Sequence, residues 1–266
     1  MMVLEKKYKE LKGLLSKSGS GVIAFSGGLD SGFLSKVAVD CLGKKVLAVT
    51  ACSPTYTRTE CASAMRIARD IGIRHEIIQT YEFNNKNFRK NTLERCYWCK
   101  RELFLQLKKI AHREGLRYVL DGTNHSDRLD IRPGSRAARS LGVISPLADC
   151  RLIKEDVRLL ARKLGLTFWN KPSGTCLSSR VPFGEPITRA RLMRIARAED
   201  ILSEFFGNET LLRARDHGDI VRIEIGKEHW TKLQNSAIYK IITRLKKLGY
   251  RYVTLDLEGY IPAGLR

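Results

Sequence analysis

The segment SGGLDS, residues 26–31, constrains the fold of this chain more than any other sequence feature. It follows an apolar run, VIAF, and precedes a stretch with helical character that begins at Asp30. Gly27 and Gly28 let the backbone turn tightly and bring its N–H groups onto a phosphate, while the following helix N-terminus adds donors and a favourable dipole. Strand, glycine turn and helix in this order predict a phosphate-binding loop at the end of a strand in an α/β sheet.

The polar side chains of this segment suit a nucleotide polyphosphate. Ser26 and Ser31 can donate further hydrogen bonds, and Asp30 is suited to hold the Mg²⁺ that accompanies the phosphates. The chain has no Walker A sequence, and residues 19–24 fit the dinucleotide fingerprint but precede the strand that this fingerprint must follow. The remaining alternative is a plain strand-to-helix turn in which Asp30 is a capping residue.

The order of the elements predicts two domains. The first half of the chain alternates strand-like and helix-like segments, which is typical of a parallel sheet covered by helices. Beyond residue 170 the order becomes helix, strand, strand, helix, strand, which indicates an α+β arrangement with an antiparallel element. We therefore expect an α/β domain over residues 1–170 and a smaller C-terminal α+β domain over residues 171–266. Expected strands are residues 22–28, 45–53, 75–83, 118–124, 211–216, 219–226 and 250–257. Expected helices are residues 1–19, 30–42, 57–72, 101–115, 153–165, 188–206 and 228–248.

Three of the seven cysteines have a spacing suited to chemistry. Cys96 and Cys99 stand three residues apart at the start of a helix, so both thiolates can reach one metal centre, and the distant Cys176 can complete it. Three ligands leave one position open, which suits a [4Fe–4S] cluster better than a closed zinc site. A dithiol redox pair at a helix N-terminus and inert buried cysteines are the alternatives. For the other four cysteines, structural packing is expected; these are Cys41, Cys52, Cys61 and Cys150.

Charge and hydropathy limit the environment and the partners. Lys and Arg exceed Asp and Glu by 48 to 28, a net charge of +20 that attracts phosphates, nucleotides or RNA, unless it reflects only a solvated basic surface. No run approaches the roughly 20 apolar residues that span a bilayer, and the N-terminal residues follow helical spacing instead of forming a signal peptide. The odd cysteine count favours a reducing cytosol. We expect a cytoplasmic, homo-oligomeric protein without a membrane partner.

The stretch VIAFSGGLDSGFL resembles the PP-loop of the ATP pyrophosphatases, which cleave ATP between the α and β phosphates. The resemblance implies that the loop holds the pyrophosphate leaving group. Its phosphate and Mg²⁺ contacts would then be Ser26, Gly27, Gly28, Asp30 and Ser31. Thr50, Ala51 and Cys52, at the end of the second strand, would lie beside the adenine and ribose.

Four further segments resemble the LarE family, whose members insert sulfur into the nickel-pincer nucleotide. They are DGTNHSDRLDIRPG, NKPSGTCLSSRVPFG, RARDHGDIVRIE and LGYRYVTLDLEGY, so the resemblance covers nearly the whole chain. One LarE type gives up its own cysteine sulfur, and the other carries three cysteines and a cluster. Cys96 and Cys99 make this chain resemble the second type, with Cys176 as third ligand. If Cys96 and Cys99 are only a redox pair, Cys176 is the sacrificial donor.

The resemblance implies ATP-dependent sulfur transfer to pyridinium-3,5-biscarboxylic acid mononucleotide or a close relative. A carboxylate would attack the ATP α-phosphate, and sulfur, from sulfide or another donor, would attack the acyl-adenylate. Lys100 or Arg101 could neutralise the α-phosphate, unless they form a solvated charge pair. Arg213 and Arg215 are two residues apart on one strand, so both side chains point to the same face and are expected to bind the substrate phosphate. The alternative for these arginines is an exposed basic face. Glu224 is expected to fix an arginine, and its alternative is a cross-strand salt-bridge partner. The expected substrate-binding residues are Arg180, Arg213, Arg215 and Glu224, with His217 nearby.

Two other functions remain open at this point. A tRNA 2-thiolation enzyme would share the PP-loop and the three cluster cysteines, and the net charge favours it, but no added zinc module or aromatic-interleaved basic arm is visible. A nucleotide-sensing adaptor would bind ATP through a decayed loop, whereas SGGLDS is intact. Nucleic acid is therefore the less expected partner.

Overall fold

The computed structural model describes residues 2–129, 133–172, 174–207 and 210–261. The motif DGTNHSDRLDIRPG extends into residues 130–132 and the motif NKPSGTCLSSRVPFG includes residue 173, which lie outside the described residues. The chain forms two compact units. The first unit combines Met1–Phe88 with Leu93–Gly174, and the second combines Arg89–Thr92 with Thr175–Arg266.

The first unit is built on a four-stranded parallel sheet in the order β3-β2-β1-β4. The strands are β1 (Gly21–Ala24), β2 (Val46–Ala51), β3 (Arg74–Ile78) and β4 (Tyr118–Asp121). Its main helices are α1 (Met2–Ser18), α2 (Leu29–Leu42), α3 (Arg58–Ile71), α5 (Arg95–Arg113), α7 (Pro133–Ser140) and α9 (Lys154–Lys163). Short helices are α4 (Lys86–Arg89), α6 (His125–Leu129) and α8 (Pro146–Asp149). The chain leaves β1 toward β2 and returns to β4 on the other side, so β1 and β4 flank a topological switch point.

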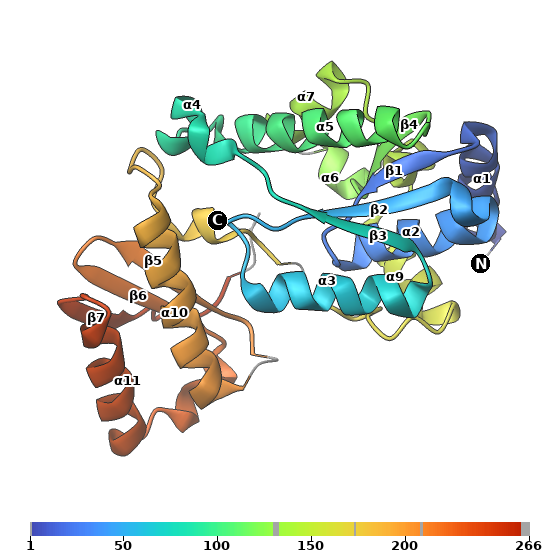
Figure 1. Ribbon diagram of the computed structural model, residues 1–266. Coiled ribbons are helices and arrows are strands. Elements are labelled where there is room, and N and C mark those ends of the chain that lie inside the picture. The colour runs from blue at the N-terminus through green and yellow to red at the C-terminus, as the bar shows by residue number, and fades with distance from the viewer. Residues whose placement is uncertain (1, 130–132, 173, 208–209, 262–266) are drawn as a thin grey trace. The chain divides into compact units, whose positions relative to one another are not determined.

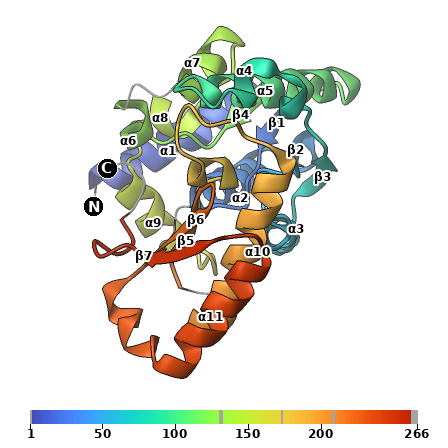
Figure 2. The ribbon, with the colours of Figure 1, turned by 90° about the vertical axis from the view of Figure 1, so that its left-hand side faces the viewer.

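Helices cover both faces of this sheet, as Figures 1 and 2 show. On one face, Leu11 of α1, Phe33 of α2 and Leu160 of α9 pack with Ile23 of β1 in a single apolar cluster. On the other face, a second cluster lies between the strands, α5 and α7, and includes Val22, Leu47, Val49, Phe104, Leu107 and Ala138. Because β1 and β2 are buried from both sides, they form nearly continuous apolar runs in the sequence, whereas the edge strand β3 is partly exposed. The expected α/β fold with a parallel sheet is confirmed.

The segment between β4 and α9 contacts β4 through a single bridge, Leu120 with Ile144. Pro146 follows shortly and cannot donate a ladder hydrogen bond, which accounts for the short pairing. Helix α5 begins at Arg95 instead of residue 101, so it contains both Cys96 and Cys99.

The second unit combines a three-stranded sheet with two long helices. Its strands, β5 (Leu212–His217), β6 (Ile220–Ile225) and β7 (Tyr252–Leu255), pair in the order β5-β6-β7. The β5–β6 pair is antiparallel, as the sequence predicts, and β6 pairs with β7 in parallel. Helices α10 (Arg189–Phe206) and α11 (Asn235–Lys247) pack onto the sheet through an apolar cluster of their own.

The helix expected over residues 228–248 is interrupted. A 3-10 helix, Lys227–Lys232, is followed by Leu233 and Gln234, and α11 starts only at Asn235. Asn and Ser are weak helix formers, so Asn235 and Ser236 disfavour a continuous helix through this point. The break lets Trp230 and Leu233 pack against the apolar cluster of the second unit. Within the described residues, no helix is long and apolar enough to cross a membrane.

Candidate functional site

The loop between β1 and α2 is organised by hydrogen bonds among its own residues. The backbone N–H of Ser26 donates to Ser31 Oγ at 3.2 Å, and the two serine hydroxyls lie 3.1 Å apart. The backbone N–H of Gly28 donates to Ser26 Oγ at 3.3 Å. Gly28 is also the N-cap residue of α2 and has an extended backbone conformation. No side chain of the described residues caps this helix, and uncapped N–H groups in a first turn are the donors that a phosphate site uses.

Glycine is required at two places around this loop. Gly27 has a φ of +66°, and a Cβ there would lie 2.6 Å from the Cα of Ala64 in α3. Gly122, just after β4, would place a Cβ 2.8 Å from the backbone nitrogen of Ser31. The loop is therefore packed between α3 and the end of β4, at the switch point where open α/β sheets bind their ligands.

Asp30 forms an ion pair with Lys154 of α9, and both side chains are largely buried. Asn124 Nδ2 also approaches Asp30 Oδ1, at 3.4 Å. Because Gly28 occupies the N-cap and Asp30 lies within the first turn, the alternative of Asp30 as a capping residue is wrong. Lys154 is the first residue of α9, where the helix dipole disfavours a cation, so its position reflects the contact with Asp30.

Lys171 supports the loop with a second ammonium group. Its Nζ donates to the carbonyl oxygen of Gly27 at 2.9 Å and to Ser63 Oγ at 2.8 Å. Two lysines, Lys154 and Lys171, therefore lie at the phosphate loop, and each comes from a segment more than 100 residues away in sequence. Such an arrangement of cations and N–H groups can bind a polyphosphate.

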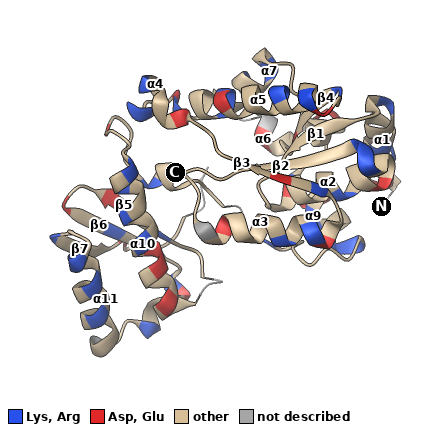
Figure 3. Cartoon of the chain, viewed as in Figure 1, with Lys and Arg blue, Asp and Glu red and all other residues tan. Residues whose placement is uncertain are grey.

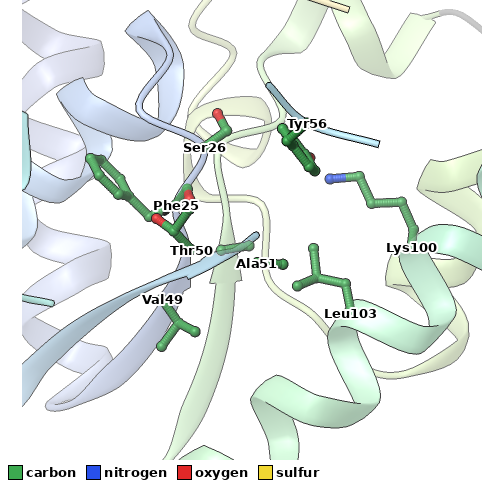
Figure 4. Close-up of a pocket in the computed structure, with 9 residues that line it drawn as sticks. Phe25, Ser26, Val49, Thr50, Ala51, Tyr56, Lys100 and Leu103 are labelled. Atoms are coloured by element: carbon green, nitrogen blue, oxygen red, sulfur yellow. Dashed lines mark hydrogen bonds between the residues drawn. The ribbon is translucent and has the colours of Figure 1, made fainter. Parts of the chain in front are cut away.

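A small cavity lies beside the loop at the carboxyl ends of β1 and β2 (Figure 4). Figure 4 shows the Lys100 side chain extending from α5 toward Tyr56, with Ala51 and Leu103 beneath. Of the residues expected at the nucleotide, the cavity brings together Ser26, Thr50, Ala51 and Lys100. Its other lining residues are Ala24, Phe25, Val49, Tyr56 and Leu103.

Thr50 connects this cavity to the edge of the sheet. Its hydroxyl donates to the carbonyl oxygen of Phe25 at 2.8 Å and lies 2.8 Å from Nε2 of His75. Because the hydroxyl proton is used by Phe25, Nε2 of His75 must be the donor to Thr50. Burial lowers the pKa of His75, which keeps its ring neutral at neutral pH.

Cys96 and Cys99 are reduced thiols on successive turns of α5, at a spacing that places their side chains on one helix face. Cys176 is also reduced and caps a 3-10 helix, Leu177–Arg180, in the second unit. No group of three His, Cys, Asp or Glu side chains forms a metal site within the part of the chain that is described. Three reduced thiols are nevertheless the donors that an iron–sulfur cluster uses.

The structure corrects the expectation for two of the remaining cysteines. Cys52 and Cys61 are joined by a disulfide with their Cα atoms 6.2 Å apart, so packing alone does not describe them. Cys41 and Cys150 do pack against the first apolar cluster, and burial raises the pKa of Cys150 to about 11. Such a thiol is a poor nucleophile at neutral pH.

In the second unit, Arg180 folds back over the segment that carries Cys176. Its Nη1 donates to the carbonyl oxygens of Thr175 and Cys176, at 2.6 and 3.2 Å. Its other nitrogens pair with Glu199 of α10, and the arginine is 8% exposed. Arg180 thus fixes the backbone around the Cys176 thiol instead of extending into solvent.

Arg213 and Arg215 lie on the same face of β5, as their spacing predicts. Arg215 forms a bidentate pair with Glu224 of β6, at 2.9 and 3.2 Å, and donates to Ser179 O at 2.7 Å. Arg213 is paired with Glu224 in the strand register, with Nη1 3.8 Å from the carboxylate. Glu224 is fully buried, so the arginines form a buried ionic cluster and not an exposed basic face.

Two neighbouring groups contribute to this cluster. Arg222 also approaches Glu224, at 3.4 Å, which gives one carboxylate three arginine partners. Burial, reinforced by Arg222, lowers the pKa of His217. Arg222 also approaches Asp256, at 3.5 Å, so the largely buried excess consists of Arg213 and Arg215 on the single carboxylate of Glu224. Two guanidinium groups that share one carboxylate are an arrangement that accepts an anion, such as a phosphate monoester.

Four groups at the nucleotide site were missed in the sequence. Lys154 could have been detected as a cation at a helix N-terminus, where the helix dipole disfavours positive charge. Gly122 could have been detected as a glycine directly after a strand. Lys171 and Tyr56 reach the site from loops, where side-chain direction does not follow a periodic pattern. Arg101, by contrast, was expected here, but it is exposed and is not among the residues that line the cavity.

Basic residues occur on elements of both units, including α1 and α11 (Figure 3). The first two turns of α10 show one local use of arginine, because Arg191 and Arg194 both pair with the fully buried Asp216. These two arginines stabilise the second unit through Asp216.

Comparison with known proteins gives consistent matches over the whole chain. A model of the NAD synthase family matches residues 3–171. An uncharacterised protein of Synechocystis sp. is 41% identical over 97% of this chain and 96% of its own length. Pyridinium-3,5-bisthiocarboxylic acid mononucleotide synthase of Lactiplantibacillus plantarum is 35% identical over 98% of this chain and 94% of its own. A component of the glutamine-hydrolysing GMP synthase of Archaeoglobus fulgidus is 26% identical over 71% of this chain and 63% of its own.

Proposed function

The chain belongs to the LarE family of PP-loop proteins, within the wider NAD synthase family, and on this premise we propose that it is an ATP-dependent sulfurtransferase. Its substrate is pyridinium-3,5-biscarboxylic acid mononucleotide, and its product belongs to nickel-pincer cofactor biosynthesis. The observation that carries the proposal is the loop at residues 26–31. It combines helix N-terminal donors and two serines with two lysines, Lys154 on the Asp30 carboxylate and Lys171 on the Gly27 carbonyl oxygen.

The first unit activates the substrate. The loop binds the β and γ phosphates of ATP through its backbone donors and through Ser26 and Ser31, and Asp30 holds Mg²⁺. A substrate carboxylate oxygen attacks the α-phosphorus, the bond to the bridging oxygen breaks, and pyrophosphate leaves onto the loop. Lys100, which lines the neighbouring cavity, neutralises charge that develops on the α-phosphate.

Adenylation makes the second step feasible. A carboxylate oxygen is a very poor leaving group, whereas AMP leaves readily. A sulfur nucleophile then attacks the acyl carbon, the bond to AMP breaks, and a thiocarboxylate forms. Arg213 and Arg215 bind the phosphate of the mononucleotide, with Glu224 fixing their geometry, and Arg180 holds the segment of Cys176.

The three reduced cysteines support an iron–sulfur enzyme of the three-cysteine type. Cys96, Cys99 and Cys176 would hold the cluster, and their thiol donor set fits it. When bound, a [4Fe–4S] cluster with three protein ligands offers one iron to hydrosulfide. If no cluster forms, Cys176 itself is the sulfur donor, and it then becomes dehydroalanine in a single turnover.

A tRNA 2-thiolation enzyme is the second candidate, since it would use the same loop and cysteines. The net charge of +20 is the observation that favours it. Against it, the 35% identical relative is named for a mononucleotide product. Co-purification of tRNA that is lost at high salt would favour this candidate.

We expect Asp30→Ala to abolish substrate-dependent release of pyrophosphate and AMP. The change removes the carboxylate that holds Mg²⁺, which is worth on the order of several kcal/mol at the transition state. The rate should therefore fall by about a hundredfold or more. The products are quantified by ion-exchange chromatography with labelled ATP.

Asp40→Ala is the matched control, because Asp40 lies on the same helix and also pairs with a lysine, Lys36, but at an exposed position. Its rate should remain within about twofold of the parent, as for a surface ion pair. Full pyrophosphate release by Asp30→Ala, or ADP as the product of the parent protein, would exclude the assignment.

We also expect each of Cys96→Ser, Cys99→Ser and Cys176→Ser to lose bound iron after anaerobic purification. A cluster held by three thiolates is destabilised when one ligand is replaced. Iron content and the visible spectrum measure the loss, and Cys41→Ser is the control that should keep its iron. Stoichiometric zinc without iron in the parent protein would contradict the cluster.

A further inference from the structure

The disulfide between Cys52 and Cys61 borders the nucleotide cavity. Cys52 directly follows Thr50 and Ala51, which line the cavity, and its backbone N–H donates to Ile78 O at 2.9 Å. Cys61 lies in α3. The bond therefore joins the end of β2, on the adenine side of the site, to a helix on the phosphate side.

The segment closed by this bond carries Tyr56 into the cavity. A turn within it is held by Tyr56 N–H donating to Ser53 O at 3.0 Å and by Thr55 N–H donating to Ser53 Oγ at 3.2 Å. Thr55 is almost completely buried, at 1% exposure. With its two ends cross-linked, this segment has little freedom to move the Tyr56 ring away from the cavity.

Helix α3, which carries Cys61, also contacts the phosphate loop. Ser63 accepts a hydrogen bond from Lys171, which also binds Gly27, and Ala64 packs against Gly27 at a distance that admits no side chain. Cys61 precedes these residues by less than one helical turn. The position of α3 thus affects both the phosphate loop and the segment that carries Tyr56.

In this cross-linked state the cavity is narrow, with a volume of about 30 Å³. Tyr56 and Lys100 both line it, and Figure 4 shows the Lys100 side chain extending toward Tyr56. A purine that binds between these two side chains would displace the segment with Tyr56 outward, which the disulfide opposes.

We propose that Cys52 and Cys61 form a thiol–disulfide switch on the nucleotide site, closed when oxidised and open when reduced. The reductant is a dithiol, whose thiolate attacks one sulfur of the disulfide to give a mixed disulfide and one cysteine thiol. The second thiol of the reductant then attacks its own sulfur in the mixed disulfide and releases the other cysteine. Two electrons and two protons pass to Cys52 and Cys61, and the dithiol becomes a disulfide.

The two cysteines are accessible enough for this exchange, since both are only half-buried. The switch rests on the proposed function in one respect, because it requires ATP to occupy this cavity. It extends that function by making nucleotide binding dependent on the redox state. A protein whose sulfur chemistry uses reduced cysteines would thereby stop consuming ATP under oxidising conditions.

The test compares binding of α,β-methylene-ATP, which is not cleaved, by oxidised and reduced protein. Thiol titration first establishes the state, since formation of the disulfide lowers the number of cysteine thiols from seven to five. We expect the oxidised protein to bind the analogue about tenfold more weakly or worse, because its binding-competent state is rarely populated. Cys52→Ser/Cys61→Ser should bind like the reduced protein under both conditions.

The double variant retains the other five cysteines, so any redox response that arises from Cys96, Cys99 or Cys176 would persist in it. Cys41→Ser should keep the full response of the parent. Equal affinity of oxidised and reduced parent protein, or a response that survives in the double variant, would overturn the switch. Because the readout is binding of an uncleaved analogue, it is independent of sulfur transfer, and either proposal can fail alone.

Discussion

Gly27 has a φ of +66°, and the Cβ that it lacks would lie 2.6 Å from the Cα of Ala64. Gly27→Ala therefore combines left-handed strain, about 1–2 kcal/mol, with overpacking of about 1–3 kcal/mol. The loop must shift to relieve the clash, so we expect Gly27→Ala to lose ATP binding. Urea unfolding and nucleotide titration measure the two effects separately.

Gly142 provides the matched control, because it has the same φ of +66° but nothing within 4 Å of its Cβ position. Gly142→Ala should show only the strain, about 1–2 kcal/mol, and bind ATP normally. Undiminished nucleotide binding by Gly27→Ala would show that the loop does not depend on its contact with α3.

At the residue scale, the sequence indicated positions whose chemistry follows from local order. Ser26, Gly27, Gly28, Asp30 and Ser31 were identifiable because a strand, a glycine turn and a helix follow one another directly. Lys154 and Lys171 were not, because they reach the loop from residues far away in sequence, through contacts that only the folded sheet creates.

At the element scale, the β5–β6 hairpin concentrates charge in the interior of the second unit. Glu224 is fully buried and pairs with Arg215 through two hydrogen bonds. Arg215→Ala leaves part of a buried charge uncompensated, so unfolding should become easier by about 3 kcal/mol. Arg244→Ala removes an exposed pair with Glu204 and should cost at most about 1 kcal/mol.

The same variants separate a structural from a substrate-binding role of the arginines. Under conditions where both proteins are folded, Arg215→Ala should also weaken binding of the pyridinium mononucleotide, with ATP affinity unchanged. Loss of stability with unaltered substrate affinity would identify the cluster as a purely structural salt-bridge network. Isothermal titration with each ligand gives the comparison.

Element boundaries show where periodicity is informative and where it is not. Residues 57–72 were predicted as a helix, and α3 covers Arg58–Ile71 between a Thr57 capping box and a left-handed Gly72, all of which are visible in the sequence. The break before α11 was missed because apolar spacing continues through Leu233, and Gln234, which caps the helix, is not a typical N-cap residue. The spacing of apolar residues indicates which face of a segment is buried. It does not reveal a break in the helix when the residues on both sides of the break bury the same face.

At the scale of the whole molecule, the order of elements in the sequence does not predict which unit every segment belongs to. Residues 89–92 belong to the second unit although they stand amid the first. They are held there by Gly184 N–H donating to Asn91 O at 3.0 Å and by Ile187 N–H donating to Arg89 O at 2.9 Å. Nothing in the local composition of this short segment distinguishes it from its neighbours.

The most direct test of the central claim is to incubate the protein anaerobically with ATP, Mg²⁺, sulfide and pyridinium-3,5-biscarboxylic acid mononucleotide, and to analyse the products by mass spectrometry. We expect a mononucleotide in which sulfur replaces a carboxylate oxygen, with one AMP and one pyrophosphate formed for each sulfur transferred. ADP in place of AMP, or sulfur incorporated into added tRNA while the mononucleotide stays unchanged, would contradict the assignment.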